Sequence, residues 1–99
     1  MKLPKYIKVW NLKYRIDVKE VATDEDYVGK CYPHQQVIEI ARGLSPQRKV
    51  QTLLHECIHA ISEEANLKMS EPKVDVLASG IMALFEDNPS LSKLIKSVK

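Results

Sequence analysis

The sequence has little of what builds a disulfide-linked or membrane protein. Only two of its 99 residues are cysteines, and Cys31 and Cys57 lie in segments of different type, which excludes a disulfide framework and suits a reducing compartment. No apolar run approaches the length of a membrane-spanning helix, and the first residues lack the apolar stretch of a secretion signal. We therefore expect one small domain, residues 1–99, in the cytoplasm.

Net charge is also small, at +2, but the charges are unevenly distributed. Residues 1–20 carry six lysines and arginines against two acids, whereas residues 55–87 carry seven acids against two lysines. A basic segment of this kind could bind nucleic acid or an acidic partner, but a solvated strand face is the more common explanation. We expect neither nucleic acid nor a membrane to be the partner.

Histidine is scarce too, yet two of the three histidines fall in the pentapeptide His55-Glu56-Cys57-Ile58-His59. This is the pattern H-E-x-x-H. On a helix, two histidines four residues apart lie on one face and can bind one zinc ion, while the glutamate between them can act on a metal-bound water. The motif predicts His55 and His59 as zinc ligands and Glu56 as a general base.

The sequence around the motif favours a helix from about residue 46 to about residue 65. Ser45 suits the N-cap, and Pro46 suits the first helical position. A helical wheel places both histidines off the apolar arc and Cys57 in its middle, so we interpret Cys57 as a core residue rather than a ligand. The alternative is that the histidines are ordinary polar residues on the outer face of the helix.

A catalytic zinc needs a third protein ligand, which the next predicted helix, about residues 71–87, can provide. Ser70 suits its N-cap, and a short connection lets its first turn return to the histidine face. Glu71 is the predicted third ligand. Asp75, one turn later, is the alternative, or it hydrogen-bonds a ligand histidine and fixes its tautomer. The predicted apolar stripe of this helix comprises Val74, Leu77, Ala78, Ile81, Leu84 and Phe85.

The N-terminal half, about residues 5–41, has the pattern of short strands. Residues 5–18 alternate as in a half-buried strand, and residues 28–32 and 36–41 form a hairpin pattern. The resulting prediction is an α+β fold with a small, mostly antiparallel, three-stranded sheet packed on the two helices. A last short helix within residues 89–99 could pack on the body, mediate self-association or cover the cleft.

In this order of elements the chain resembles the small phage-encoded gluzincins, or minigluzincins, which are similar to the ImmA/IrrE-type metallopeptidase domain. The residues that carry the resemblance are Leu44-Ser45-Pro46-Gln47-Arg48, Thr52-Leu53-Leu54-His55-Glu56-Cys57-Ile58-His59-Ala60, Ser70-Glu71 and Val74-Asp75-x-Leu77-Ala78. The resemblance implies a zincin-like fold whose third zinc ligand is Glu71, with Asp75 behind it. It also implies that residues 37–41, the strand before the motif helix, pair with an extended substrate.

Together these features predict a zinc-dependent peptidase acting on a peptide or protein, with Zn²⁺ held by His55, His59 and Glu71 and with Glu56 as general base. His34, Tyr27 and Tyr32 are candidates to stabilise the oxyanion. One alternative is a catalytically silent or latent zinc-binding interaction module of phage or prophage origin, with a regulatory protein partner. Another is a nucleic-acid adaptor that uses the basic sheet.

Overall fold

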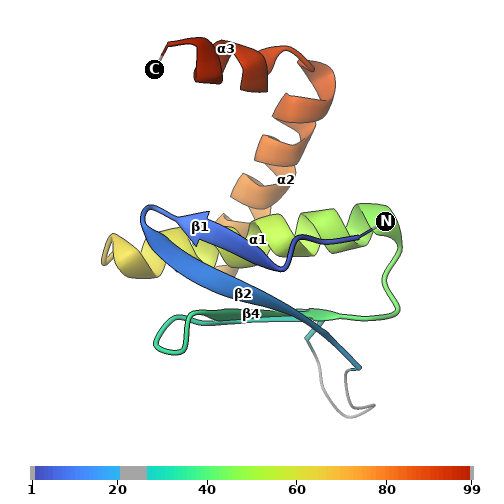
Figure 1. Cartoon of the computed structure of the whole chain (residues 1–99), viewed down its shortest axis with the longest axis vertical. Helices are drawn as coiled ribbons and strands as arrows, with labels where there is room; N and C mark the ends of the chain where they lie inside the picture. The colour runs from blue at the N-terminus through green and yellow to red at the C-terminus, as the bar shows by residue number, and fades with distance from the viewer. Residues whose placement is uncertain (1, 21–26, 99) are drawn as a thin grey trace.

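A computed structural model describes residues 2–20 and 27–98 and has the expected α+β class, a sheet packed on helices (Figure 1). Its elements in chain order are β1 (Tyr6–Val9), β2 (Leu12–Lys19), β3 (Gly29–Tyr32), β4 (Val37–Ala41), α1 (Pro46–Glu64), α2 (Glu71–Asp87) and α3 (Leu91–Ser97). Within the described ranges, no helix is both long and apolar enough to cross a membrane.

The sheet differs from the prediction, because it has four strands in the order β1-β2-β4-β3 and is mixed. The two outer pairs are antiparallel, whereas β2 and β4 are parallel. Residues 5–18 are two strands rather than one, since the chain reverses at Trp10, whose φ of 53° is in the left-handed region. The apolar strand β4 enters the centre of the sheet, where both of its edges are paired.

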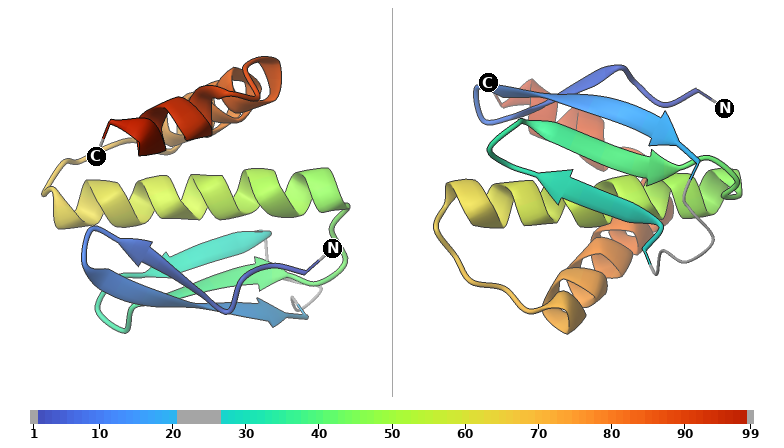
Figure 2. Two further views of the ribbon diagram at one scale, coloured as in Figure 1. Left: turned by 45° about the horizontal axis from the view of Figure 1, so that its top comes forward. Right: turned by 90° about the horizontal axis from the view of Figure 1, so that it is seen from below.

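Helix α1 covers one face of the sheet (Figure 2). Alternate residues of β4, Ile38 and Ile40, are fully buried in the cluster that joins the sheet to Leu53 and Ala60 of α1. Glu39, between the two isoleucines, accepts a 2.7 Å bond from Lys19 Nζ in the neighbouring strand. The period-two pattern of β4 therefore fixes which sheet face meets the helix.

The ends of α1 confirm the predicted helix to within one residue. Ser45 caps the first turn, because its hydroxyl oxygen accepts a 3.3 Å bond from the Arg48 N–H, and Pro46 follows at the first position. At the other end Asn66 takes a left-handed conformation with φ 56°, and its N–H and that of Leu67 bond back to the last turn. This stop turns the chain toward α2.

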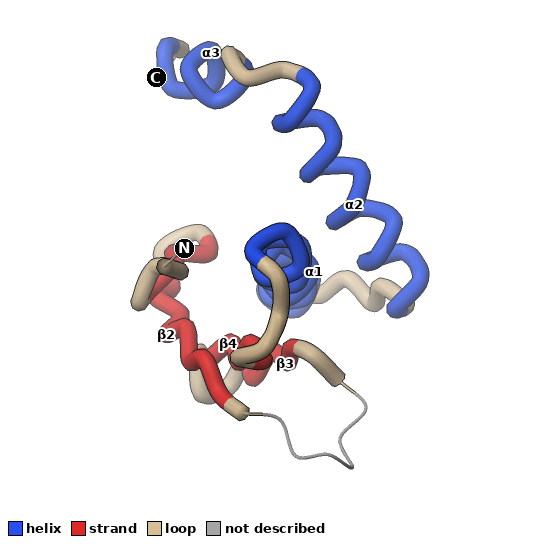
Figure 3. Tube along the Cα trace, turned by 90° about the vertical axis from the view of Figure 1, so that its right-hand side faces the viewer, coloured by secondary structure: helices blue, strands red, loops and turns tan. Residues whose placement is uncertain are grey.

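Helix α2 crosses α1 and then leaves it. Val74 and Ala78 of the predicted stripe are buried against Ile58 of α1. Farther along, Leu84 and Phe85 are exposed, since α2 extends past the end of its contact with α1 (Figure 3). Helix α3 lies at the far end of α2, none of its residues is buried, and it does not cover the cleft described below.

Loss of the α1 cap should weaken the whole fold, because α1 contacts both the sheet and α2. We expect Ser45→Ala to lower the free energy of unfolding by about 1 kcal/mol. Ser70→Ala is the matched control, since Ser70 occupies the N-cap of α2 but its side chain makes no capping bond. Urea unfolding of both variants measures the difference, and equal losses would contradict the role of the Ser45 hydroxyl.

Candidate metal centre

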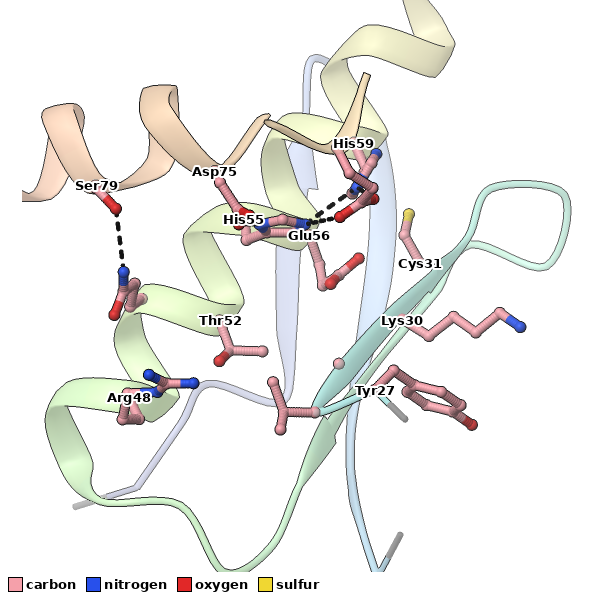
Figure 4. Close-up of a pocket in the computed structure, with 14 residues that line it drawn as sticks. Tyr27, Lys30, Cys31, Arg48, Thr52, His55, Glu56, His59, Asp75 and Ser79 are labelled. Carbon is pink, nitrogen blue, oxygen red and sulfur yellow. Dashed lines mark hydrogen bonds and ion pairs between the residues drawn. The ribbon is translucent and has the colours of Figure 1, made fainter. Parts of the chain in front are cut away.

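A cleft of about 760 Å³ lies between α1, the edge strand β3 and the first half of α2 (Figure 4). All four residues that the motif and the third-ligand prediction selected line it: His55, Glu56, His59 and Glu71. The other lining residues are Tyr27, Val28, Gly29, Lys30, Cys31, Arg48, Gln51, Thr52, Asp75 and Ser79. Three separate elements of the chain therefore meet at the motif.

His55, His59 and Glu71 form a compact group that could hold a metal ion. Their ligand atoms all lie within 4.8 Å of one another. The two Nε2 atoms are 3.2 Å apart, and the Glu71 carboxylate lies 2.5 Å from His59 Nε2 and 3.1 Å from His55 Nε2. The helical spacing of the histidines sets the first distance. The packing of α2 on α1 brings the Glu71 carboxylate to both rings.

Asp75 occupies a different place from Glu71. Its carboxylate lies 2.7 Å from Nδ1 of His55, whereas Glu71 lies at Nε2 of the same ring. One turn of α2 thus puts the two carboxylates on opposite nitrogens of one imidazole. In this arrangement Asp75 can accept a hydrogen bond from Nδ1–H, which leaves Nε2 free to bind a metal. This position suits the positioning role of Asp75, and the choice between that role and the ligand role stays a prediction.

Glu56 lies beside this group but outside it. The residue is only 5% exposed, and it points into the cleft between α1 and β3 (Figure 4). Burial raises the pKa of its carboxyl above the ordinary value, the neighbouring histidines oppose that rise, and Glu71 and Asp75 add to it. The helical wheel did not reveal this burial, since the strand that covers Glu56 comes from another part of the chain.

Gly29 of β3 allows the sheet to approach α1 at this point. A Cβ added there would lie 2.5 Å from Thr52 Cγ2 and 3.2 Å from the Glu56 carboxylate. The strand register places Gly29 opposite Ile40, in the row of residues that faces the helix. No motif in the sequence marked Gly29, because its role depends on a contact between β3 and α1.

The two cysteines pack against the buried core and neither joins the ligand group, although Cys31 also lines the cleft. Cys57 and Cys31 both lie against the buried cluster between sheet and helix, as the wheel predicted for Cys57. Burial raises the pKa of the Cys57 thiol to about 11 and that of Cys31 to about 12. In the metal-free protein both thiols therefore stay protonated near neutral pH, and neither belongs to the group that His55, His59 and Glu71 form.

Other predicted site features lie elsewhere. His34 is exposed in the β3–β4 turn, and Tyr32 directs its hydroxyl to Glu39 at 3.4 Å, so neither lines the cleft, although Tyr27 does. The prediction that residues 37–41 pair with substrate is wrong, since β4 lies between β2 and β3 and has no free edge. Among residues 2–20 and 27–98, the unpaired strand edge beside the cleft belongs to β3.

Comparisons with protein-family models, with curated proteins and with solved structures found no match to this chain. The resemblance to small gluzincins therefore stays a prediction that rests on the motif residues. Any function has to be argued from the geometry around His55, His59 and Glu71.

A side chain at position 29 should force β3 and α1 apart. We expect Gly29→Ala to lower the free energy of unfolding by about 1–3 kcal/mol, since overpacking at a tight contact costs that much. Gly80→Ala is the matched control, because nothing lies within 4 Å of an added Cβ at that helical position and alanine should stabilise α2 by about 1 kcal/mol. Urea unfolding measures the stability of both variants, and a Gly29→Ala protein as stable as the wild type would contradict the close contact between β3 and α1.

The raised pKa of Glu56 predicts a pH-dependent stability of the metal-free protein. Because the folded state holds this proton to higher pH than the unfolded state, Glu56 contributes stability at low pH that is lost as pH rises through the raised value. We expect Glu56→Gln to become progressively more stable than the wild type as pH rises above about 4, the ordinary pKa of a glutamate. Urea unfolding in a chelating buffer measures the difference, and a difference that shrinks as pH rises would contradict the burial effect.

Proposed function

We propose that this chain is a zinc-dependent peptidase. The observation that carries the proposal is the convergence of two imidazole Nε2 atoms and one carboxylate in a cleft, beside a buried glutamate that is not part of the group. A purely structural zinc site has no need of such a glutamate.

The donor set suits zinc. Two imidazole nitrogens and one carboxylate are a frequent ligand set of catalytic zinc, which keeps a fourth position for water or substrate, whereas magnesium and calcium prefer oxygen donors alone. His55, His59 and Glu71 would hold the ion. When bound, zinc supplies a Lewis acid that polarises a carbonyl and makes water more acidic.

Glu56 is the proposed general base. Its carboxylate takes the proton of the attacking water and then delivers it to the leaving amine. Burial between α1 and β3 raises its pKa toward the working pH, which favours a group that must both accept and release a proton. The tight contact at Gly29 holds the carboxylate in the cleft.

Asp75 is the proposed positioning residue. Its contact with Nδ1 of His55 holds the ring in one orientation and selects the tautomer whose Nε2 lone pair faces Glu71 and His59. The substrate is an extended peptide. The unpaired edge of β3 runs along the cleft, and an added strand would place its main chain next to Glu56.

Zinc content and cleavage of unfolded casein should separate these roles. We expect Glu56→Gln to keep zinc and lose cleavage by about 10²–10⁴-fold, because only the proton transfer is removed. Glu71→Ala should lose most of its zinc. Asp75→Asn should lower zinc affinity or cleavage activity by about 10–100-fold without abolishing either.

Each result also has a contrary outcome. Full zinc occupancy in Glu71→Ala would remove Glu71 from the ligand set, and unchanged cleavage by Glu56→Gln would remove Glu56 from the mechanism. A wild-type protein that binds zinc stoichiometrically but cuts no peptide bond would support the silent interaction module instead.

A further inference from the structure

The cleft continues beyond the ligand group to Arg48. Residues 48, 52, 55 and 59 all line it, and their spacing of four, three and four puts them on one face of α1. Arg48 lies two turns before His55. Its guanidinium points from α1 into the cleft, toward the start of β3 (Figure 4).

Charge changes sign along this cleft. Glu56, Glu71 and Asp75 surround the histidines at one end, and Arg48 lies at the other. Lys30 also belongs to the lining, but its ammonium lies over the rings of Tyr27 and Tyr32, 5.4 Å from each centroid. No acidic side chain within residues 2–20 and 27–98 lies within ion-pair distance of Arg48.

A hydrogen bond joins α1 to α2 at this end of the cleft. Gln51 Nε2 donates a 3.1 Å hydrogen bond to Ser79 Oγ, which ties α1 to α2 one turn from Asp75. A chain in this end of the cleft therefore lies over the face of α1, between the edge of β3 and α2, where Arg48 is part of the lining.

The distance along α1 from His55 to Arg48 determines which residue of a bound peptide lies at Arg48. The seven helical steps from Arg48 to His55 span about 10 Å, which equals about three residues of an extended strand. Strand β3 runs in the same direction as α1 (Figure 2). A peptide that pairs antiparallel with β3 therefore has its C-terminal side at Arg48.

We infer that Arg48 is a carboxylate-binding residue, which selects peptides carrying a carboxylate about three residues after the bond to be cut. Guanidinium and carboxylate form a two-bond contact that a neutral group cannot replace. The carboxylate is either the C-terminus of the peptide or an aspartate or glutamate side chain. The position of the cut rests on the proposed function, but carboxylate binding by Arg48 does not.

Peptide binding tests this inference without turnover. The probes are three N-terminally fluorescein-labelled hexapeptides of alanine and valine: one with a free C-terminus, its C-terminal amide, and an amide with one internal glutamate. Fluorescence anisotropy is measured with the Glu56→Gln protein, alone and combined with Arg48→Gln or with Arg42→Gln. Arg42 is the matched control, because it is an exposed arginine that does not line the cleft.

We expect a peptide with a carboxylate to bind about fivefold more tightly than the uncharged amide, the size of an exposed ion pair. The preference should disappear with Arg48→Gln, remain with Arg42→Gln, and weaken at high salt. Preference for the free C-terminus alone identifies the terminus as the ligand, and preference for the internal glutamate identifies a side chain. No preference, no binding by any of the three peptides, or a preference that survives Arg48→Gln overturns the inference.

The outcome is separable from that of the proposed function. If casein cleavage is unaffected by Arg48→Gln and binding shows no carboxylate preference, the peptidase proposal stands and the carboxylate site is contradicted. If peptide binding depends on Arg48 but the wild-type protein cleaves no casein, the carboxylate site stands and the peptidase proposal is contradicted.

Discussion

Helix α1 packs against the sheet with one face and against α2 with another, and the candidate site depends on this double contact. Leu53 and Ala60 bury the sheet side, while Ile58 meets Val74 of α2. The hydrophobic burial on both sides fixes α1 between its neighbours. The motif residues occupy the face left between these contacts, where β3 and α2 approach from opposite sides.

This arrangement places an acidic group, Glu56, under a strand, and no ion pair to it is found within residues 2–20 and 27–98. Burying the Glu56 carboxylate is unfavourable in free energy, and the two neighbouring histidines offset part of that cost. A cation held by His55, His59 and Glu71 would offset more of it. The unfavourable burial of the Glu56 carboxylate therefore lies where the proposed chemistry needs a base, and perturbed ionisable groups are common at functional sites.

The sequence predicted best what depends on neighbours along the chain. The cap at Ser45 and the four-residue spacing of the histidines act within one helix, so the limits of α1 and the shared face of His55 and His59 followed directly. The position of β4 inside the sheet and the contact at Gly29 depend on pairing between distant segments, which periodicity does not encode. For Arg48, the helical spacing from His55 follows from the sequence. The cleft that Arg48 lines does not, because it forms only when α1, β3 and α2 pack together.

We propose that His55, His59 and Glu71 bind one zinc ion without help from either cysteine. X-ray absorption at the zinc edge of the loaded wild-type protein tests it most directly. We expect nitrogen and oxygen ligands at about 2.0–2.2 Å with the outer scattering of two imidazoles. A zinc–sulfur distance of about 2.3 Å, or the scattering of a single imidazole, would contradict it.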